Sequence, residues 1–69
     1  MSLGEKIIQL RKERGLNAYQ CSIQLGISPA RFTYIEKGRN LPSAELLIKL
    51  CNFFNVTSDW LLGLKETRN

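Results

Sequence analysis

The chain has 69 residues, of which 43% are hydrophobic and 23% charged, so it has room for one small domain. Ten Lys and Arg against six Asp and Glu leave a net charge of +4, which favours polyanionic partners. No apolar run reaches the roughly 20 residues of a membrane span, and Met1–Glu5 lacks the features of a secretory signal, so we expect a cytoplasmic protein without a membrane partner.

Metal and catalytic chemistry find little support in the composition. Histidine is absent and only Cys21 and Cys51 could ligate through sulfur, so one subunit cannot complete a structural zinc site. Their apolar neighbours favour reduced core thiols, with a disulfide as the alternative. The six carboxylates are scattered, and no nucleophile–base pair is evident. We expect no metal, no cofactor, no small-molecule ligand and no enzymatic activity.

Two helices are predicted in the first third of the chain, where strand patterns are absent. Ser2 and Glu5 have the spacing of a capping box, which opens a helix that Gly15 ends. Asn17 caps a second helix, which ends at Gly26. Both segments carry hydrophobic residues at helical spacing, as a packed helix requires.

Two further helices follow. Ser28 is a predicted cap and Pro29 the first helical residue, where the missing N–H has no cost, and this helix stops before Gly38. Ser43 caps the fourth helix and Asn55 is a plausible left-handed stop. The expected core of all these helices is aliphatic and aromatic, with one or two thiols: Leu3, Ile7, Leu10, Cys21, Leu25, Phe32, Ile35, Leu47, Leu50, Cys51 and Phe54.

A short fifth helix is predicted near the end. Thr57 or Ser58 caps it, and it runs to Gly63. Lys65–Asn69 is polar and is expected to be frayed. The sequence therefore predicts an all-α fold with one domain over residues 1–64 and a polar tail over residues 65–69.

The segment Asn17–Glu36 is the most informative part of the sequence. Its two short helices flank Gly26-Ile27-Ser28, in which Gly26 permits a sharp bend, Ile27 points back to the core and Ser28 starts the next helix. Such a helix-turn-helix holds its second helix outward, so that the N-terminal half can enter a DNA major groove. On spacing alone, an ordinary corner between two helices is an equal alternative.

From Leu3 to Gly63 the chain resembles the Cro/cI-type repressor family, also called the XRE-type helix-turn-helix family. The resemblance implies a compact five-helix bundle of the lambda-repressor-like DNA-binding type, acting as a transcriptional repressor that inserts helix 28–36 into the major groove of double-stranded DNA. It rests on Ile7, Leu10, Arg11, Gly15, Leu16, Leu25-Gly26-Ile27-Ser28, Ile35-Glu36-Lys37-Gly38-Arg39, Pro42-Ser43, Leu47, Leu50, Phe54-Asn55-Val56 and Asp59-Trp60-Leu61-Leu62.

The resemblance also implies roles for individual residues. Arg11 and Glu36 correspond to a structural ion pair between the first helix and the end of the recognition helix, with two solvated charges as the alternative. The outward side of the recognition helix would read bases and the loop after it would hold phosphates, unless both are an ordinary solvated surface. The expected DNA-binding residues are Asn17, Ala18, Ser28, Pro29, Ala30, Arg31, Thr33, Tyr34, Lys37, Arg39 and Asn40.

The chain departs from the family pattern in two ways. Ala18 stands where the family usually has a Gln that bonds the DNA backbone and braces the recognition helix, which puts affinity in doubt. Ile23, Leu46 and Phe53 stand where polar or small residues are usual, and are candidates for an exposed apolar surface.

The last helix of this family often pairs two subunits, so a homodimer is expected. Two-fold symmetry would then place two recognition helices about 34 Å apart, one turn of DNA. The alternative is a protein-interaction module on the same fold, an antitoxin-like or antirepressor-like partner. The candidate dimer residues are Phe53, Trp60, Leu61 and Leu64.

Overall fold

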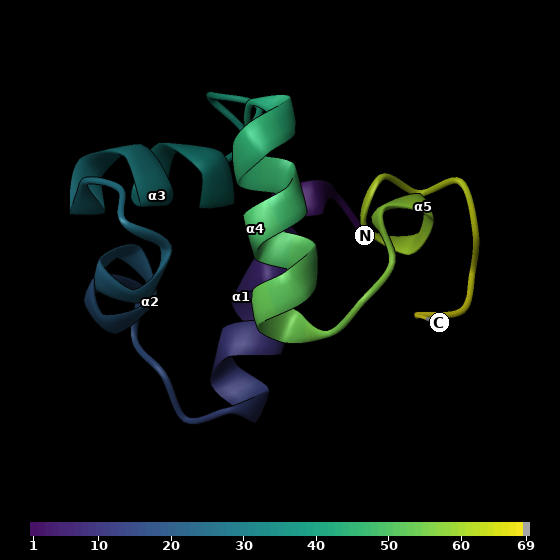
Figure 1. Cartoon of the computed structure of the whole chain (residues 1–69), viewed down its shortest axis with the longest axis horizontal. Helices are drawn as coiled ribbons and strands as arrows, with labels where there is room; N and C mark the ends of the chain where they lie inside the picture. The colour runs from purple at the N-terminus through teal and green to yellow at the C-terminus, as the bar shows by residue number, and fades with distance from the viewer. Residues whose placement is uncertain (69) are drawn as a thin grey trace.

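The computed structural model describes residues 1–68, and over that range it contains five helices and no strand. The all-α fold predicted from the sequence is therefore confirmed. Figure 1 shows α4 crossing in front of α1, with α2 and α3 to one side and α5 to the other. The helices are α1 (Leu3–Glu13), α2 (Ala18–Leu25), α3 (Pro29–Glu36), α4 (Ala44–Phe54) and α5 (Ser58–Leu61).

Every helix begins after a side-chain cap. Ser2 and Asn17 each form a complete capping box, in which the backbone N–H of the cap also donates to the side chain of the third helical residue. Ser28 and Ser43 accept from the backbone N–H three residues on, at 3.1 and 3.2 Å. Thr57 does the same for α5, which decides between the two caps that the sequence allowed. Each cap satisfies a backbone donor that has no partner within the helix.

Two left-handed residues end helices where the chain must turn sharply. Gly26 closes α2 with φ +72°, and Asn55 closes α4 with φ +56°. Glycine has no β-carbon to clash in this region, and asparagine tolerates it better than most residues do. These two stops send α3 and α5 away from the helices that precede them, as the sequence predicts.

The core lies between α1, α3 and α4 and is closed by α2 and α5. Leu46 belongs to it with 3% of its surface exposed, so the expectation of an exposed apolar side chain there is wrong. Cys21 is fully buried and Cys51 partly so, and both are free thiols. Burial raises the pKa of both. The buried hydrophobic residues are Ile7, Leu10, Cys21, Leu25, Phe32, Ile35, Leu46, Leu50, Phe54, Val56, Trp60 and Leu61.

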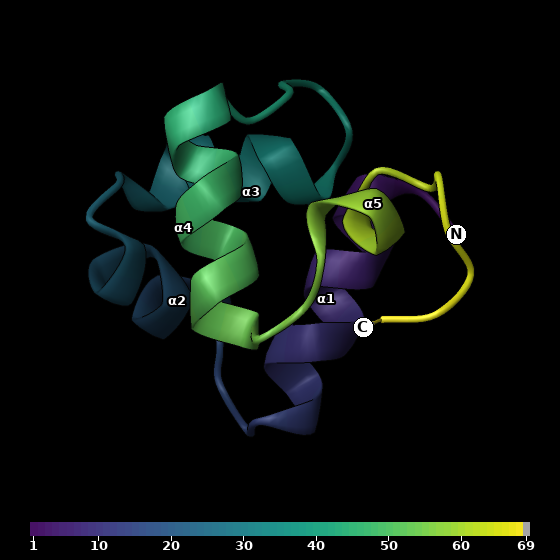
Figure 2. The ribbon, with the colours of Figure 1, turned by 45° about the vertical axis from the view of Figure 1, so that its right-hand side comes forward.

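The C-terminal segment, expected to be frayed, is held to the rest of the protein at Arg68, whereas Lys65, Glu66 and Thr67 are exposed. The carbonyl of Arg68 accepts from the Thr57 N–H at 2.8 Å, and its guanidinium makes two 2.9 Å hydrogen bonds to the Glu13 carboxylate. The same guanidinium lies 5.1 Å from the Trp60 ring centroid. Figure 2 shows the chain after α5 curving back toward α1. Asn69, the last residue of the expected tail, lies outside the described residues.

Candidate nucleic-acid interface

α2 and α3 pack against each other across the turn Gly26-Ile27-Ser28. The Ile27 N–H donates to the Ser22 carbonyl at 3.0 Å, and its side chain is partly buried against the core. Ser22 is fully buried, and its hydroxyl donates to the Tyr19 carbonyl at 2.7 Å. The turn is thus held from inside the protein, and α3 leaves it with a fixed direction.

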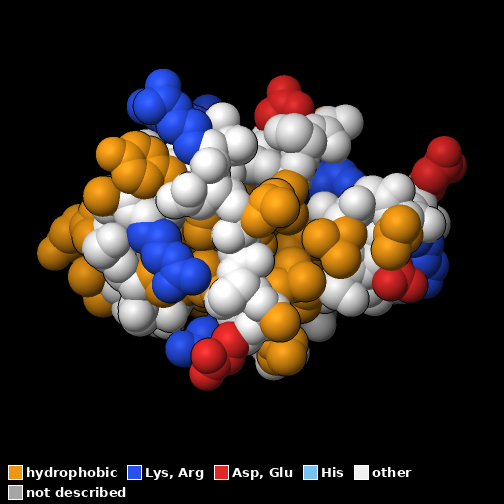
Figure 3. Space-filling view, turned by 90° about the horizontal axis from the view of Figure 1, so that it is seen from above, with side chains coloured by type: hydrophobic (Ala, Val, Ile, Leu, Met, Phe, Trp, Pro, Cys, Tyr) orange, Lys and Arg blue, Asp and Glu red, His pale blue; other side chains and the backbone are white. Residues whose placement is uncertain are grey.

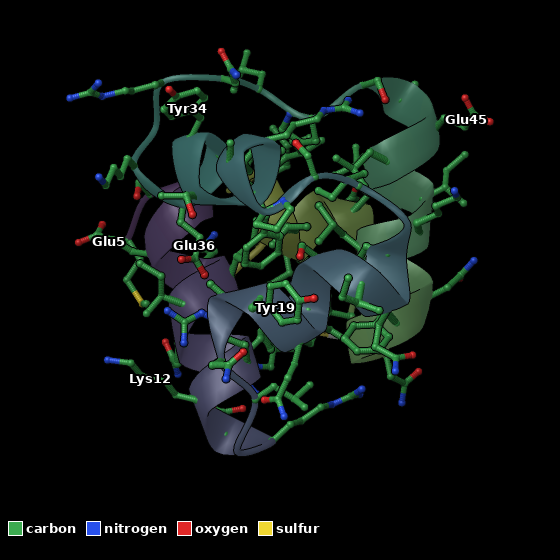
Figure 4. The ribbon with its side chains drawn as sticks, turned by 90° about the vertical axis from the view of Figure 1, so that its left-hand side faces the viewer. Glu5, Lys12, Tyr19, Tyr34, Glu36 and Glu45 are labelled. Atoms are coloured by element: carbon green, nitrogen blue, oxygen red, sulfur yellow. The ribbon has the colours of Figure 1, made fainter. Side chains whose placement is uncertain are left out.

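α3 has one buried side and one free side. Phe32 and Ile35 are 1% and 2% exposed and attach the helix to the core. At 3.6 residues per turn, Ala30, Thr33 and Tyr34 lie on the opposite side. Tyr34 is 45% exposed and lies at the outer end of α3 in Figure 4. Of the predicted base-reading residues, Pro29, Ala30 and Tyr34 are exposed and Thr33 is partly buried.

The start of α3 and its flank are also open to solvent. Ser28, Pro29, Ala30 and Arg31 are all exposed, whereas Thr33 is partly buried at the edge of the helix. In the first turn of this helix Pro29 has no N–H, the Arg31 N–H donates to the Ser28 hydroxyl and the Phe32 N–H to the Ser28 carbonyl, which leaves the Ala30 N–H without a partner in the helix. Arg31 and Thr33 lie on the two flanks of α3, and Arg31 shares a surface hollow with Ser43 and Glu45 beside α4.

The loop after α3 continues this surface. The N–H groups of Arg39 and Asn40 both donate to the Tyr34 carbonyl, at 2.8 and 3.4 Å, so the loop is tied to the end of the helix. Lys37, Arg39 and Asn40 are exposed, and neither cation has an ion-pair partner within residues 1–68. Figure 3 shows basic and hydrophobic side chains intermingled on the α3 side, with acidic ones toward the margins. This face is electropositive.

Three of the four basic residues in α1 and at its C-terminal cap interact with other groups of the protein. Lys6 is 8% exposed, and its ammonium donates to the Trp60 carbonyl at 2.6 Å. Arg14 donates to the Phe53 carbonyl, and Arg11 is paired with a carboxylate. Only Lys12 points freely into solvent, as Figure 4 shows. Arg31, Lys37 and Arg39 are the exposed cations of α3 and the loop after it, and within residues 1–68 Lys12, Arg14, Lys49 and Lys65 are exposed elsewhere.

Arg11 and Glu36 form the ion pair that the resemblance implies. Arg11 Nε donates to Glu36 Oε2 at 2.6 Å and Nη2 donates to Oε1 at 3.3 Å, with side chains only 16% and 7% exposed. These hydrogen bonds raise the pKa of Arg11. Arg11 also donates to the Leu16 carbonyl at 3.4 Å. The pair joins α1 to the last residue of α3 and thereby fixes where the loop after α3 begins.

The start of α2 lies beside α3, but it carries fewer polar side-chain groups for a contact with DNA than the family pattern would supply. The Asn17 side chain caps the helix through a 2.8 Å hydrogen bond from the Gln20 N–H. Ala18 is partly buried against the core. It has no polar group for a phosphate or for a brace to α3, so only backbone N–H groups are available there.

The proposed dimer residues do not form one surface. Trp60 and Leu61 are 7% and 1% exposed in the subunit's own core, so they offer little surface to a second subunit. Phe53 is partly buried, with its ring 4.9 Å from that of Phe54 in an edge-to-face arrangement. Leu64 is 76% exposed and is therefore accessible to a second subunit.

Lys6 and Arg68 are structural residues that the sequence does not reveal. Their cationic groups lie 4.9 and 5.1 Å from the centroid of the Trp60 ring. Such contacts stabilise by about 0.5–1 kcal/mol each at exposed sites and more when desolvated. A basic residue far along the chain from an aromatic one gives no sequence signal of this kind.

Comparison with known proteins decides the family. A model of the helix-turn-helix domain matches residues 4–66. The chain belongs to the helix-turn-helix family. This helix-turn-helix chain also contains, within residues 1–68, no group of three or more side chains placed to hold a metal ion. None of its helices in that range is long and apolar enough to cross a membrane.

Curated relatives share this domain and extend beyond it. The helix-turn-helix chain is 32% identical over 66 residues to the HTH-type transcriptional regulator ImmR of Bacillus subtilis (strain 168), covering 96% of the chain and 52% of ImmR. It is 36% identical to the HTH-type transcriptional activator BcrR of Enterococcus faecalis, covering 96% of the chain and 32% of BcrR. It thus spans about half the length of these relatives or less.

Solved structures share the fold. The P22 c2 repressor, crystallised in complex with the synthetic operator 9T, superposes with a TM-score of 0.84 at 24% identity, over 90% of this chain and 94% of the repressor chain. A chain of the SinR/SinI complex superposes with a TM-score of 0.79 at 28% identity, over 87% and 59%. The lambda-repressor-like five-helix fold expected from the sequence is therefore confirmed.

Proposed function

We propose that the protein is a sequence-specific DNA-binding transcriptional regulator, most simply a repressor, that places α3 in the major groove of double-stranded DNA. The observation that carries this proposal is the side of α3 that carries Ala30, Thr33 and Tyr34, which we call the ridge of α3. The cations next to this ridge have no ion pair within residues 1–68. The names of the relatives and the operator complex of P22 c2 support it. Such a function implies a cytoplasmic location and needs no catalysis.

The ridge of α3 offers two kinds of base contact. Ala30 and Thr33 present methyl groups, which suit the methyl group of thymine. The Thr33 hydroxyl can donate to or accept from a base edge, and the Tyr34 hydroxyl can reach a base or a phosphate. A good contact of this type contributes about 1–3 kcal/mol of discrimination between bases.

The flanks of the ridge suit the DNA backbone. Arg31 lies beside the start of α3, and Lys37, Arg39 and Asn40 follow its end, so phosphates on either side of the groove could be held. Free backbone N–H groups next to Asn17 and Ser28 add donors at two helix starts. Because each neutralised phosphate releases counterions, affinity should fall steeply with salt.

We further propose a homodimer, through a surface that keeps Leu64 of the residues the sequence indicated and adds Leu62. Leu62 and Leu64 are 50% and 76% exposed, next to core residues that cannot themselves make the contact. Exposed aliphatic side chains close together are typical of surfaces that a partner covers. Pairing two copies near α5 would present two α3 helices to successive turns of one DNA face.

Selection of bound fragments from random duplex DNA tests the proposal. We expect a recovered consensus with two-fold symmetry, and binding to it that weakens by orders of magnitude between about 50 and 200 mM salt. Retention of every sequence alike would leave a nonspecific DNA-binding protein. No retention even at low salt would overturn the proposal and favour a protein-interaction module.

A further inference from the structure

A second surface, between α2 and α4, is shaped to bind something other than DNA. It is a groove of about 400 Å³, walled by Ile23 on one side and by Phe53 on the other. Leu25, which is 3% exposed, forms part of its floor. Gly26 closes one end without a side chain, and a β-carbon built there would meet no atom within 4 Å. The groove is therefore open, and its apolar residues Ile23, Leu25 and Phe53 are accompanied by Gln24, Lys49 and Asn52.

Its apolar walls are accessible to a partner. Ile23 is 57% exposed on the side of α2 that faces away from the core. Phe53 is partly buried, with one side of its ring facing the groove. No other segment of residues 1–68 covers Ile23. Burying such side chains stabilises a complex by roughly 25 cal/mol for each Å² of apolar surface removed from water.

The charges around the groove have one sign. Lys49 lies on its α4 side and has no ion pair within residues 1–68. At the Phe53 end, the Arg14 guanidinium lies 5.3 Å from the ring centroid. None of the residues that line the groove is Asp or Glu. A basic rim around an apolar floor is complementary to an occupant with apolar and acidic side chains.

The groove leaves the proposed DNA surface free. The ridge of α3 faces away from Phe32 and Ile35, whereas the groove lies beyond α2 on the side of α4. Figure 1 shows α3 above α2 and to the left of α4. A ligand in the groove and DNA on α3 could therefore be bound together.

We infer that the groove is a docking site for an acidic amphipathic helix of a partner protein. Apolar side chains at positions i, i+3 or i+4, and i+7 of that helix would lie between Ile23 and Phe53 above Leu25. Carboxylates beside them would face Lys49 and Arg14. This inference rests on the α2–α4 surface alone and stands whether or not α3 binds DNA.

Synthetic peptides provide the probe. The first is a helical 18-residue peptide with Leu at i, i+3, i+4 and i+7 and Glu on both flanks, and the second carries Lys in place of every Glu. Titration into isotope-labelled protein should shift amide resonances of Gln24 and Asn52 with the Glu peptide, and much less with the Lys peptide. Ala30 and Tyr34 of the DNA surface should not shift.

Two variants at equally exposed positions distinguish binding in the groove from nonspecific binding of the peptide to apolar surface. Ile23→Glu should abolish binding of the Glu peptide, while Ile48→Glu, at an equally exposed position on another side of α4 (62% against 57%), should leave it unchanged. Lys49→Glu should weaken the Glu peptide about tenfold and strengthen the Lys peptide, because it reverses the charge of the rim.

Three results would overturn the inference. Equal losses from Ile23→Glu and Ile48→Glu would mean that the peptide binds without a site. Equal affinity of the Glu and Lys peptides would show that the basic rim does not select an acidic partner. A loss of affinity for random duplex DNA in Lys49→Glu, equal to that in Arg39→Ala, would assign the groove to the DNA surface. Unchanged DNA binding by Ile23→Glu, with peptide binding lost, would support two independent sites.

Discussion

Gly4 on α1 lies directly against the main-chain carbonyl of Glu36 at the end of α3. A β-carbon built on Gly4 would overlap the carbonyl oxygen and lie only 2.7 Å from the carbonyl carbon. The neighbour is backbone and cannot rotate away, so this contact requires glycine. It brings α1 and α3 together at the residue that also carries the ion pair with Arg11.

Gly4→Ala should therefore destabilise the protein, although alanine normally favours a helix. Overpacking costs about 1–3 kcal/mol, against about 1 kcal/mol gained from helix propensity. Denaturant unfolding measures the difference. Ala30→Gly on the exposed ridge of α3 serves as the propensity control, and should also destabilise, by about 1 kcal/mol. A Gly4→Ala protein more stable than the parent would contradict the contact.

Arg11→Met should reduce the free energy of unfolding by about 2–3 kcal/mol, because it leaves the nearly buried Glu36 carboxylate without its partner. Arg11→Met combined with Glu36→Leu should be less destabilised than the single variant, since no lone charge remains. Denaturant unfolding of both proteins gives the comparison. A double variant less stable than the single one would mean that the pair stabilises by more than the cost of its desolvation.

Acidification should release the C-terminal segment from Trp60. Hydrogen bonds from Arg68, and then from Gln9, lower the pKa of Glu13 to about 2 from its ordinary value of 4.5. Since the folded pKa is the lower one, the contact stabilises fully above pH 4.5 and is lost as the pH falls through about 2. Trp60 is the sole tryptophan, and its fluorescence should report the change.

The matched variant for that titration is Arg68→Ala. It should show at neutral pH the emission that the parent reaches only in acid, and its emission should change little between pH 4.5 and 2. High salt should act on the parent in the same direction as acid, because the Glu13–Arg68 bridge is exposed. An identical acid transition in both proteins would locate its cause elsewhere.

Arg39→Ala and Thr33→Ala should weaken DNA binding in different ways. Loss of a phosphate contact at Arg39 should lower the affinity for all sequences alike and reduce the slope of log K against log salt by about 1. Loss of a base contact at Thr33 should relax the sequence preference at one position, by about 1–3 kcal/mol, with the slope unchanged. Binding to the selected and to a scrambled duplex at several salt concentrations distinguishes the two.

Ala18→Gln should increase the affinity for DNA. Ala18 is the first residue of α2 and has no polar group, although it lies at a helix start beside α3. An amide side chain there can donate to a phosphate, and after the cost of ordering it we expect a gain of about 1 kcal/mol, or about fivefold. Ala18→Leu, of similar size and without a donor, is the control. Equal affinities for the two variants would show that position 18 lies off the DNA.

The helices could be predicted from the sequence because their limits are set by local interactions. Ser2, Asn17, Ser28 and Ser43 each cap within three residues of themselves, and Gly26 acts through its own backbone conformation. Capping and left-handed stops need no knowledge of the rest of the fold. The exposed ridge of α3 follows from the same helical periodicity.

Contacts between distant segments could not be predicted in this way. Arg68 meets Glu13 across 55 residues, and polar composition alone indicated a frayed tail. Trp60 and Leu46 were assigned to the surface because of the family pattern, yet the packing of α5 and α4 turns both inward. The Arg11–Glu36 ion pair was predicted from the family resemblance, because the spacing of the two residues in the sequence does not indicate that they meet.

The N-terminus and the end of the described chain lie together beside α5, at the opposite end of the molecule from α3 (Figure 1). Met1 shares a surface hollow with Trp60 and Gly63, and Arg68 stacks on the same tryptophan. A purification handle or a dye attached ahead of Met1 would therefore project away from α3. Such a label should leave the contact of a single subunit with DNA unchanged, but it would lie beside the surface through which we propose that two subunits pair.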